Sequence, residues 1–307
     1  MSSTMRFIYI FLVLVLPLSG SAQYFWDIGF RAGGANYLGE IGGTDQAKRE
    51  WIYDIKLSQT RWNSGLFARY RLSPNVAITT GINYMRVQGA DSLTDYPVRF
   101  GRNLSFRNDI VETYTRAEYS FFGVSDVGRT GRYRLDFKSY VFIGAALFYN
   151  NPKGFYEGKW HALQPLNTEQ LDTKYSRWQP SIPLGIGFYY TFKRQHRFGW
   201  EFSWRITFTD YIDDASTVFA DPDEFDSELA ANLANRSGEQ IDDPRHPGID
   251  KYAPGAIRGN PDSKDSYLTT SFTYSYVLRG SGRSFGKKKY NYLYGKRRKG
   301  GRTRAKF

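Results

Sequence analysis

The residues of this 307-residue chain that could most readily perform acid–base chemistry are its three histidines, His161, His196 and His246. A hydrolase would need a Ser or Asp held beside such an imidazole in a defined geometry. No local pattern around the three histidines supplies one, and His161 and His246 fall in stretches that we expect to be long loops. The sequence therefore predicts no enzyme, no catalytic residue and no cofactor.

Two other patterns could bind small ligands. The glycine pairs Gly33-Gly34 and Gly42-Gly43 lack the spacing of a phosphate-binding loop and fit sharp turns or a close approach of backbone. Residues 221–228 are acidic but lack the glycine and the ligand spacing of a calcium-binding EF-hand loop. We expect a solvated loop there, with calcium binding as the alternative, and we predict no metal site.

The densest charge lies at the carboxyl end, where residues 279–307 contain twelve Lys and Arg and no Asp or Glu. This excess equals the formal net charge of +12 of the whole chain. Such a block repels itself and is expected to be disordered alone. We expect it to dock to an acidic protein surface or to anionic envelope material, with a merely solubilising tail as the alternative. The cations assigned to partner binding are Arg283, Lys287, Lys288, Lys289, Lys296, Arg297, Arg298, Lys299, Arg302, Arg304 and Lys306.

The elements that must position these groups are β-strands. Apolar and polar residues alternate with a period of two in eight stretches, which is typical of strands with two different faces. In one of them Val111 and Thr113 share a face, whereas Glu112 and Arg116 share the other. The chain also carries 23 Phe, 24 Tyr and 7 Trp, as expected for strands that face lipid on one side. The stretches are residues 24–32, 66–72, 76–84, 111–121, 133–147, 182–192, 198–208 and 268–278.

The polar faces carry charges that would point into a lumen. Eight strands enclose an interior that side chains can just fill, and isolated inward charges would be costly. We therefore expect a packed, ion-paired interior, with a pore or a catalytic groove as the alternative. The inward charges are Arg69, Arg71, Glu112, Arg116, Glu118, Glu201 and Arg205.

The connections between the strands alternate in length, as in outer-membrane barrels, which have short periplasmic turns and long external loops. The joins near Pro74, near Gly128 and at residues 193–196 are short or moderate. The long joins cover residues 38–63, 88–109, 151–178 and 213–266. In the last long join we expect one helix over residues 228–235, which Ser227 or Asp226 would cap and Gly238 would end.

The amino end predicts export. Arg6 precedes an apolar stretch at residues 7–18, and Gly20-Ser21-Ala22 offers small residues for cleavage. That stretch is shorter than the roughly 20 residues of a membrane-spanning helix. A cleaved signal peptide leaves both chain ends in the periplasm, where the basic tail meets no nucleic acid. The chain contains no Cys, which excludes disulfides and a lipoprotein anchor.

Together these features predict an all-β fold: an eight-stranded antiparallel transmembrane β-barrel with long extracellular loops and a basic periplasmic C-terminal tail. The expected organisation is a signal peptide at residues 1–22, an outer-membrane barrel at 23–278 and the tail at 279–307. A secreted β-sandwich is the alternative. It predicts mainly aliphatic buried faces and no alternation of loop length.

Several loop phrases carry a resemblance to a known family. They are Ala35-Asn36-Tyr37-Leu38-Gly39-Glu40-Ile41-Gly42-Gly43, Tyr149-Asn150-Asn151-Pro152-Lys153, Trp160-His161-Ala162-Leu163-Gln164-Pro165-Leu166-Asn167-Thr168-Glu169-Gln170 and Thr209-Asp210-Tyr211-Ile212-Asp213-Asp214-Ala215-Ser216-Thr217. With the basic tail, they make the chain resemble the PorG family of outer-membrane barrels of Bacteroidetes. The resemblance implies a non-enzymatic part in type IX protein secretion and gliding motility. The implied partner is a periplasmic ring, built from a lipoprotein and its partner protein, which the barrel ties to the outer membrane.

Three functions remain open from the sequence. The first is an anchor for a secretion or gliding assembly, through the periplasmic side. The second is a small porin-like or surface-binding barrel that uses its extracellular loops. The third is a lipid-modifying barrel enzyme, which would depend on His161 or His246.

Overall fold

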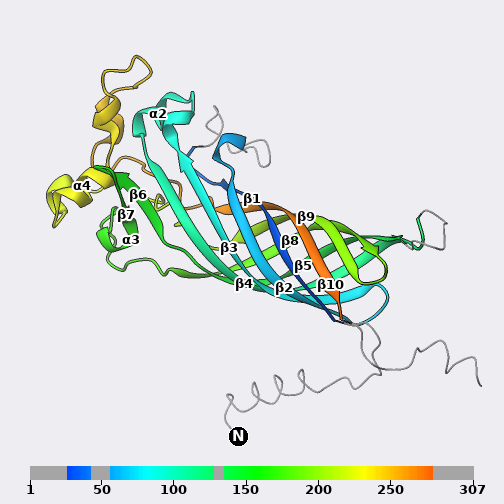
Figure 1. Ribbon diagram of the computed structural model, residues 1–307. Helices are drawn as coiled ribbons and strands as arrows, with labels where there is room; N and C mark the ends of the chain where they lie inside the picture. Colours follow the sequence, from blue (N-terminus) through cyan, green and yellow to red (C-terminus); the bar gives the residue numbers. More distant parts are fainter. Residues whose placement is uncertain (1–25, 43–55, 128–134, 279–307) are drawn as a thin grey trace, which may run out of the picture.

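The computed structural model describes residues 26–42, 56–127 and 135–278. Eight long strands in these ranges form a closed antiparallel barrel (Figure 1). They are β1 (Trp26–Leu38), β2 (Arg61–Arg71), β3 (Val76–Ala90), β4 (Ser105–Val124), β5 (Leu135–Tyr149), β8 (Trp178–Phe192), β9 (His196–Thr207) and β10 (Ser266–Val277). The predicted eight-stranded barrel is confirmed, and each of the eight predicted stretches overlaps one of these strands.

Closure is complete around the ring. Each strand pairs with the next along the chain, β5 pairs with β8, and β1 pairs with β10 from Asp27↔Val277 to Leu38↔Ser266. A closed ring leaves no backbone edge unpaired, which is the condition for a sheet to exist in lipid. All of the observed strands except β5 are longer than the predicted stretches, and several of them continue past the barrel into the loop end. Thus β4 begins at Ser105, whereas the alternation in the sequence is clear only from Val111.

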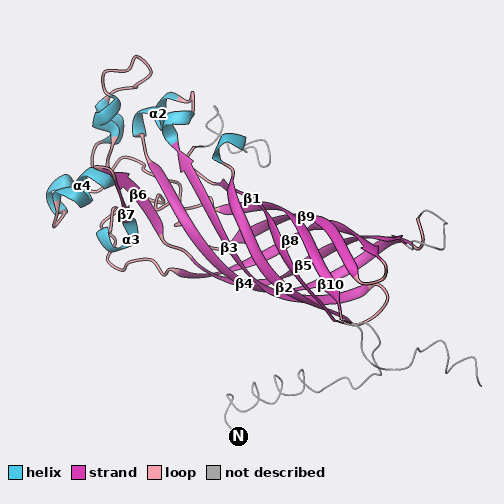
Figure 2. Cartoon of the chain, in the orientation of Figure 1, coloured by secondary structure: helices cyan, strands magenta, loops and turns pink. Residues whose placement is uncertain are grey.

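The two ends of the barrel differ. Short turns follow β2 and β8 at one end, and the long connections gather at the other (Figure 2). There, a hairpin of β6 (Pro152–Tyr156) and β7 (Lys159–Ala162) extends the β4 edge. Three α-helices also lie there: α2 (Pro97–Arg102), α3 (Leu163–Leu166) and α4 (Glu228–Ala234). The single-turn helices are η2 (Leu57–Gln59), η3 (Asp91–Leu93), η4 (Pro222–Glu224), η5 (Ser237–Gln240) and η6 (Ile249–Tyr252).

The one helix predicted in the loops is confirmed as α4. The Ser227 side chain accepts a hydrogen bond from the Ala230 backbone N–H at 3.2 Å, as expected of an N-cap. The helix ends at Ala234, before the predicted stop at Gly238. The β6–β7 hairpin, α2 and α3 lie in stretches where the sequence predicted only loops.

The barrel is apolar outside and charged inside, which is the reverse of a soluble domain. Phe30, Ile143 and Phe272 are 52%, 60% and 74% exposed on the outer face, whereas Arg116 and Glu201 are 2% and 1% exposed within. Aromatic residues gather on the outer face near both ends, such as Trp26 with Tyr70, and Trp62 with Tyr84. An exterior of this kind needs lipid around it, and paired aromatic girdles are typical of barrels in outer membranes. The chain therefore folds as an outer-membrane β-barrel.

Among the residues that the structure describes, no helix is long and apolar enough to cross a bilayer.

Candidate functional site

The half of the lumen nearer the short turns is filled by ion pairs centred on Glu201. Its Oε1 lies 2.6 Å from Arg116 Nη2, its Oε2 lies 3.1 Å from Arg31 Nη1, and the Tyr140 hydroxyl donates to Oε1 at 2.5 Å. Gly187 makes this possible, because a Cβ there would lie 2.8 Å from the Tyr140 hydroxyl oxygen. Glycine at this position therefore leaves room for the Tyr140 side chain beside Glu201.

Arg69 connects two further carboxylates to this group. Its Nε lies 2.7 Å from Glu118 Oε2, and its Nη1 lies 3.1 Å from Asp27 Oδ2. Asp27 also pairs with Arg197, with 2.5 Å between Oδ2 and Nη1. Arg116 closes the group through its 2.8 Å contact with Glu118.

A second unit lies nearer the loops. Arg205 Nη2 lies 3.2 Å from Glu112 Oε1, and Glu112 accepts further hydrogen bonds from Asn83 at 2.8 Å and from the Tyr267 hydroxyl at 2.9 Å. The predicted packed, ion-paired interior is thus confirmed for six of its seven residues. Arg71 is the exception: it makes no ion pair with any described residue and lies at the turn end of the barrel.

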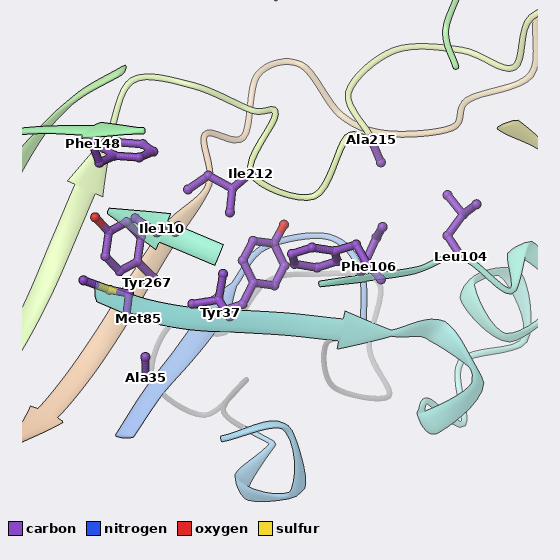
Figure 3. Close-up of a cluster of buried hydrophobic side chains, with 12 residues drawn as sticks. Ala35, Tyr37, Met85, Leu104, Phe106, Ile110, Phe148, Ile212, Ala215 and Tyr267 are labelled. Carbon is purple, nitrogen blue, oxygen red and sulfur yellow. The ribbon is translucent and has the colours of Figure 1, made fainter. Parts of the chain in front are cut away.

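Buried apolar side chains form a layer on the loop side of these ion pairs. Figure 3 shows the side chains of this layer. Strand residues supply most of it, and Ile212 and Ala215 reach it from the connection between β9 and β10. The rings of Tyr37 and Phe106 meet edge to face, with centroids 4.8 Å apart. The layer comprises Ala35, Tyr37, Ile41, Met85, Val87, Leu104, Phe106, Ile110, Phe148, Ile212, Ala215 and Tyr267.

Above this layer, three of the loop phrases that carried the family resemblance meet in one buried polar cluster, which we name the loop cap. It consists of Tyr37, Asp91, Arg102, Glu169, Asp213, Asp214, Arg258 and Asp265.

Tyr37 joins the barrel to the loop cap. Its hydroxyl oxygen lies 2.6 Å from Asp213 Oδ2 and 2.6 Å from Asp265 Oδ1. A phenol has a single proton to donate, so one of the two carboxyl groups must carry a proton and donate back. Burial raises the pKa of Asp213.

Arg258 is the central cation of the loop cap. Its Nη1 lies 2.9 Å from Glu169 Oε1, its Nη2 lies 3.7 Å from Asp214 Oδ2, and its Nε donates to the Ala234 carbonyl at the end of α4 at 3.1 Å. Glu169 also accepts the backbone N–H of Ser216 at 2.7 Å. One guanidinium therefore ties together three segments that are distant in the sequence.

Arg102 plays the same part on the other side. It holds Asp91 through two hydrogen bonds of 2.7 and 3.0 Å, and donates to the backbone carbonyls of Glu40 at 3.0 Å and Arg258 at 2.5 Å. These contacts link α2, η3 and the loops after β1 and α4. The loop cap is thus cross-linked by two fully buried arginines.

Burial dominates the acid–base behaviour of the loop cap. It raises the pKa of Asp214 to about 7, although Arg258 opposes the shift. It also raises the pKa of Asp210 to about 8, with a further contribution from the charge of Asp213. The pKa of Tyr175 is raised as well, by burial and by the adjacent Asp214, whose Oδ1 its hydroxyl reaches at 2.5 Å.

The residues that the sequence assigned to partner binding all lie in the tail, outside the described residues. The predicted signal peptide at residues 1–22 also lies outside them. The described residues that matter most were only partly foreseen. Three charged residues of the lumen were not among the predicted inward charges. Asp27 and Arg31 share one face of the predicted stretch 24–32, and Arg197 has the same parity as Glu201 in β9. Arg102 and Arg258 carried no signal, because their partners come from other loops.

The ion-paired lumen and the apolar layer occupy the path along the barrel axis, and the loop cap fixes the described loops at one end.

His161 lies in the β6–β7 hairpin. His246 lies in the connection before β10, where the centroid of its ring is 5.4 Å from that of Tyr252.

Comparisons with solved structures give barrels at low identity. The N-terminal β-barrel domain of OprF from Pseudomonas aeruginosa is 10% identical with a TM-score of 0.33, over 82% of this chain and 97% of that one. The outer membrane protein AlkL is 12% identical with a TM-score of 0.33, over 88% and 97%. A major outer membrane protein from Thermus thermophilus is 11% identical with a TM-score of 0.32, over 82% and 99%.

No curated protein matches the sequence. A family described as "Domain of unknown function (DUF6089)" matches residues 5–237, which include all strands from β1 to β9 and the three loop phrases that meet in the loop cap. Since this match covers well over half of the sequence, the chain belongs to the DUF6089 family.

Proposed function

We propose that this chain is a non-enzymatic outer-membrane barrel that anchors a periplasmic assembly to the outer membrane. The supporting observation is the filled lumen, in which Glu201, Glu118 and Asp27 are each held by at least two arginines. A barrel whose interior is occupied acts through its two ends. The turn end is the one from which the chain continues into the basic tail.

The partner that we propose is the periplasmic ring of the type IX secretion and gliding machinery, built from a lipoprotein and its partner protein. This follows the PorG-like resemblance of the loop phrases. The signal peptide places the turns and the tail in the periplasm in this proposal. Docking through many cations would be fast and sensitive to salt.

The test is extraction of the native envelope in mild detergent, followed by identification of what stays attached. Ring components should co-purify with the full chain, and a chain that lacks residues 283–307 should release them while still inserting as a barrel. Retention of the ring by the shortened chain would overturn the role of the tail. Failure of the full chain to retain ring components would overturn the anchor.

A surface-binding barrel is the second candidate, and the loop cap favours it. Its two buried arginines and five buried carboxyl groups cross-link the described parts of the outer loops, and a surface that is held in place loses little entropy on binding. The porin-like form of this candidate predicts ion conductance in planar bilayers. We expect an electrically silent barrel, because the arginines of the lumen leave their carboxylates only at a large cost.

A further inference from the structure

The turn end of the barrel contains a cavity that the proposed anchor does not use. It measures about 200 Å³ and opens where β2, β5, β8, β9 and β10 end or begin. In Figure 1 this is the end of the barrel at which β10 finishes. Its lining consists of Arg71, Asp136, Lys138, Tyr189, Thr191, Arg194, Arg197 and Val277.

The lining has an excess of positive charge. It holds four cations and one carboxylate, and Arg197 also pairs with Asp27 inside the lumen, at 2.5 Å. Lys138 feels the like charges of both Arg71 and Arg197 and the opposite charge of Asp136, so one carboxylate faces several cations in the cavity. Asp136 accepts the backbone N–H of Asp126 at 3.0 Å, which directs one of its oxygens toward the β4–β5 connection.

The arrangement of the cations suits a carboxylate. Arg71 and Arg194 are guanidinium forks that match a carboxylate through two parallel hydrogen bonds. Lys138 donates to the Pro74 carbonyl, so its ammonium is held at the rim. The Tyr189 ring, 4.9 Å from the Arg197 guanidinium carbon, and Val277 supply an apolar wall. The cavity is smaller than the roughly 300 Å³ of the smallest drug-sized sites, and this suits a side chain.

The position of the cavity selects the source of that carboxylate. Tyr189, Thr191, Arg197 and Val277 are all buried on the inward face, so the cavity belongs to the mouth of the lumen rather than to the lipid-facing wall. A phospholipid headgroup beside the barrel would have to leave the bilayer to enter it. A peptide beneath the barrel would not.

We propose that this turn-end cavity is a binding site for the carboxylate side chain of an acidic peptide segment in a periplasmic partner. Val277 lines the cavity, and the basic tail of the sequence begins two residues later, at Arg279. The inference rests on the proposed anchor and adds a specific pocket to it. Arg71, the one predicted lumen charge outside the ion-pair network, thereby has a role.

The experiment uses the full exported chain in a zwitterionic detergent and a fluorescent synthetic octapeptide of alternating Glu and Gly. Binding is measured by anisotropy at low salt, and the shift in gel mobility on heating verifies that each variant is folded. Arg71→Gln and Arg194→Gln should each weaken binding about ten- to hundredfold, as expected for the loss of one charge-assisted contact. Arg71→Lys should weaken it less, because it keeps the charge.

The matched control is Arg245→Gln, which removes the same charge from an exposed ion pair with Asp243 at the loop end. It should leave binding unchanged, and a peptide with Gln in place of Glu should not bind. Equal affinity of wild type, Arg71→Gln and Arg194→Gln would exclude the cavity as the binding site and leave the proposed anchor function intact. Cavity-dependent binding of the peptide, without ring components in the envelope extract, would overturn the anchor alone.

Discussion

Glu201 lies among three guanidinium groups, those of Arg116, Arg31 and, at 3.8 Å, Arg69. All of them are almost fully buried, so none can be solvated when a partner is lost. Removing one member of such a group leaves uncompensated charge, which is far more damaging than losing a surface pair. The stability of the barrel therefore depends strongly on single residues at its centre.

We expect Glu201→Gln to destabilise the folded barrel by about 3–5 kcal/mol, because it leaves three arginines with too few carboxylates. Urea-induced unfolding in lipid vesicles measures this as a lower midpoint. The control is Asp243→Asn, which removes a carboxylate of the same kind from an exposed pair with Arg245 and should leave the midpoint almost unchanged. A midpoint for Glu201→Gln equal to that of the control would contradict the role of the network.

The loop cap should be sensitive to pH. The pKa of Asp214 is raised to about 7 and that of Asp210 to about 8, from an ordinary value of 3.8. The folded loop cap therefore holds more protons than the unfolded loops between these values, and its stability falls as the pH rises toward 7–8. Hydrogen exchange of residues 209–217, corrected for the intrinsic rate, should show more protection at pH 6 than at pH 8.5. Asp214→Asn should reduce this difference, and an unchanged difference would exclude Asp214 as its source.

At the scale of elements, the loops at the cap end are held by long-range contacts rather than by regular structure. Arg258 reaches the end of α4, the segment after α3 and the segment after β9. The α-helices there have four to seven residues, too few to be stable alone. The arginine contacts are what give this end a defined surface.

Arg258→Leu should release the connection between β9 and β10 while the barrel stays closed. The change leaves Glu169 buried without its cation, a loss of about 3–5 kcal/mol. Limited proteolysis measures it: cleavage within residues 210–262 should become at least tenfold faster, with the barrel fragment intact. Arg245→Leu, in the same connection but exposed, is the matched variant and should be cleaved at the wild-type rate.

The strands could be predicted because each carries its own alternation, which requires no knowledge of its neighbours. The inward charges Glu112, Arg116 and Glu201 were identified in the same way. The loop cap could not be predicted, since Arg102 and Arg258 acquire their roles only when loops that lie up to 156 residues apart in the sequence meet. The β6–β7 hairpin was missed because its strands have five and four residues, too short for alternation to stand out.

At the scale of the whole molecule, two exposed isoleucines lie in different surroundings. Ile143 is 60% exposed on the outer wall of β5, and Ile257 is 78% exposed in the loops. If lipid surrounds the wall, Ile143→Arg should cost about 2–4 kcal/mol near the bilayer midplane, whereas Ile257→Arg should cost almost nothing. The folded fraction in phospholipid vesicles measures both. Equal folding of the two variants would show that the wall does not face lipid.

The pairing of β1 with β10 has a consequence for how the protein is made. The first barrel strand has no permanent neighbour on one side until the last one has been synthesised and exported. A chain that lacks the last strand would have two strand edges with unpaired backbone groups, and these could pair with other chains. The barrel can therefore close only once β10, the last strand in the sequence, is available to pair with β1.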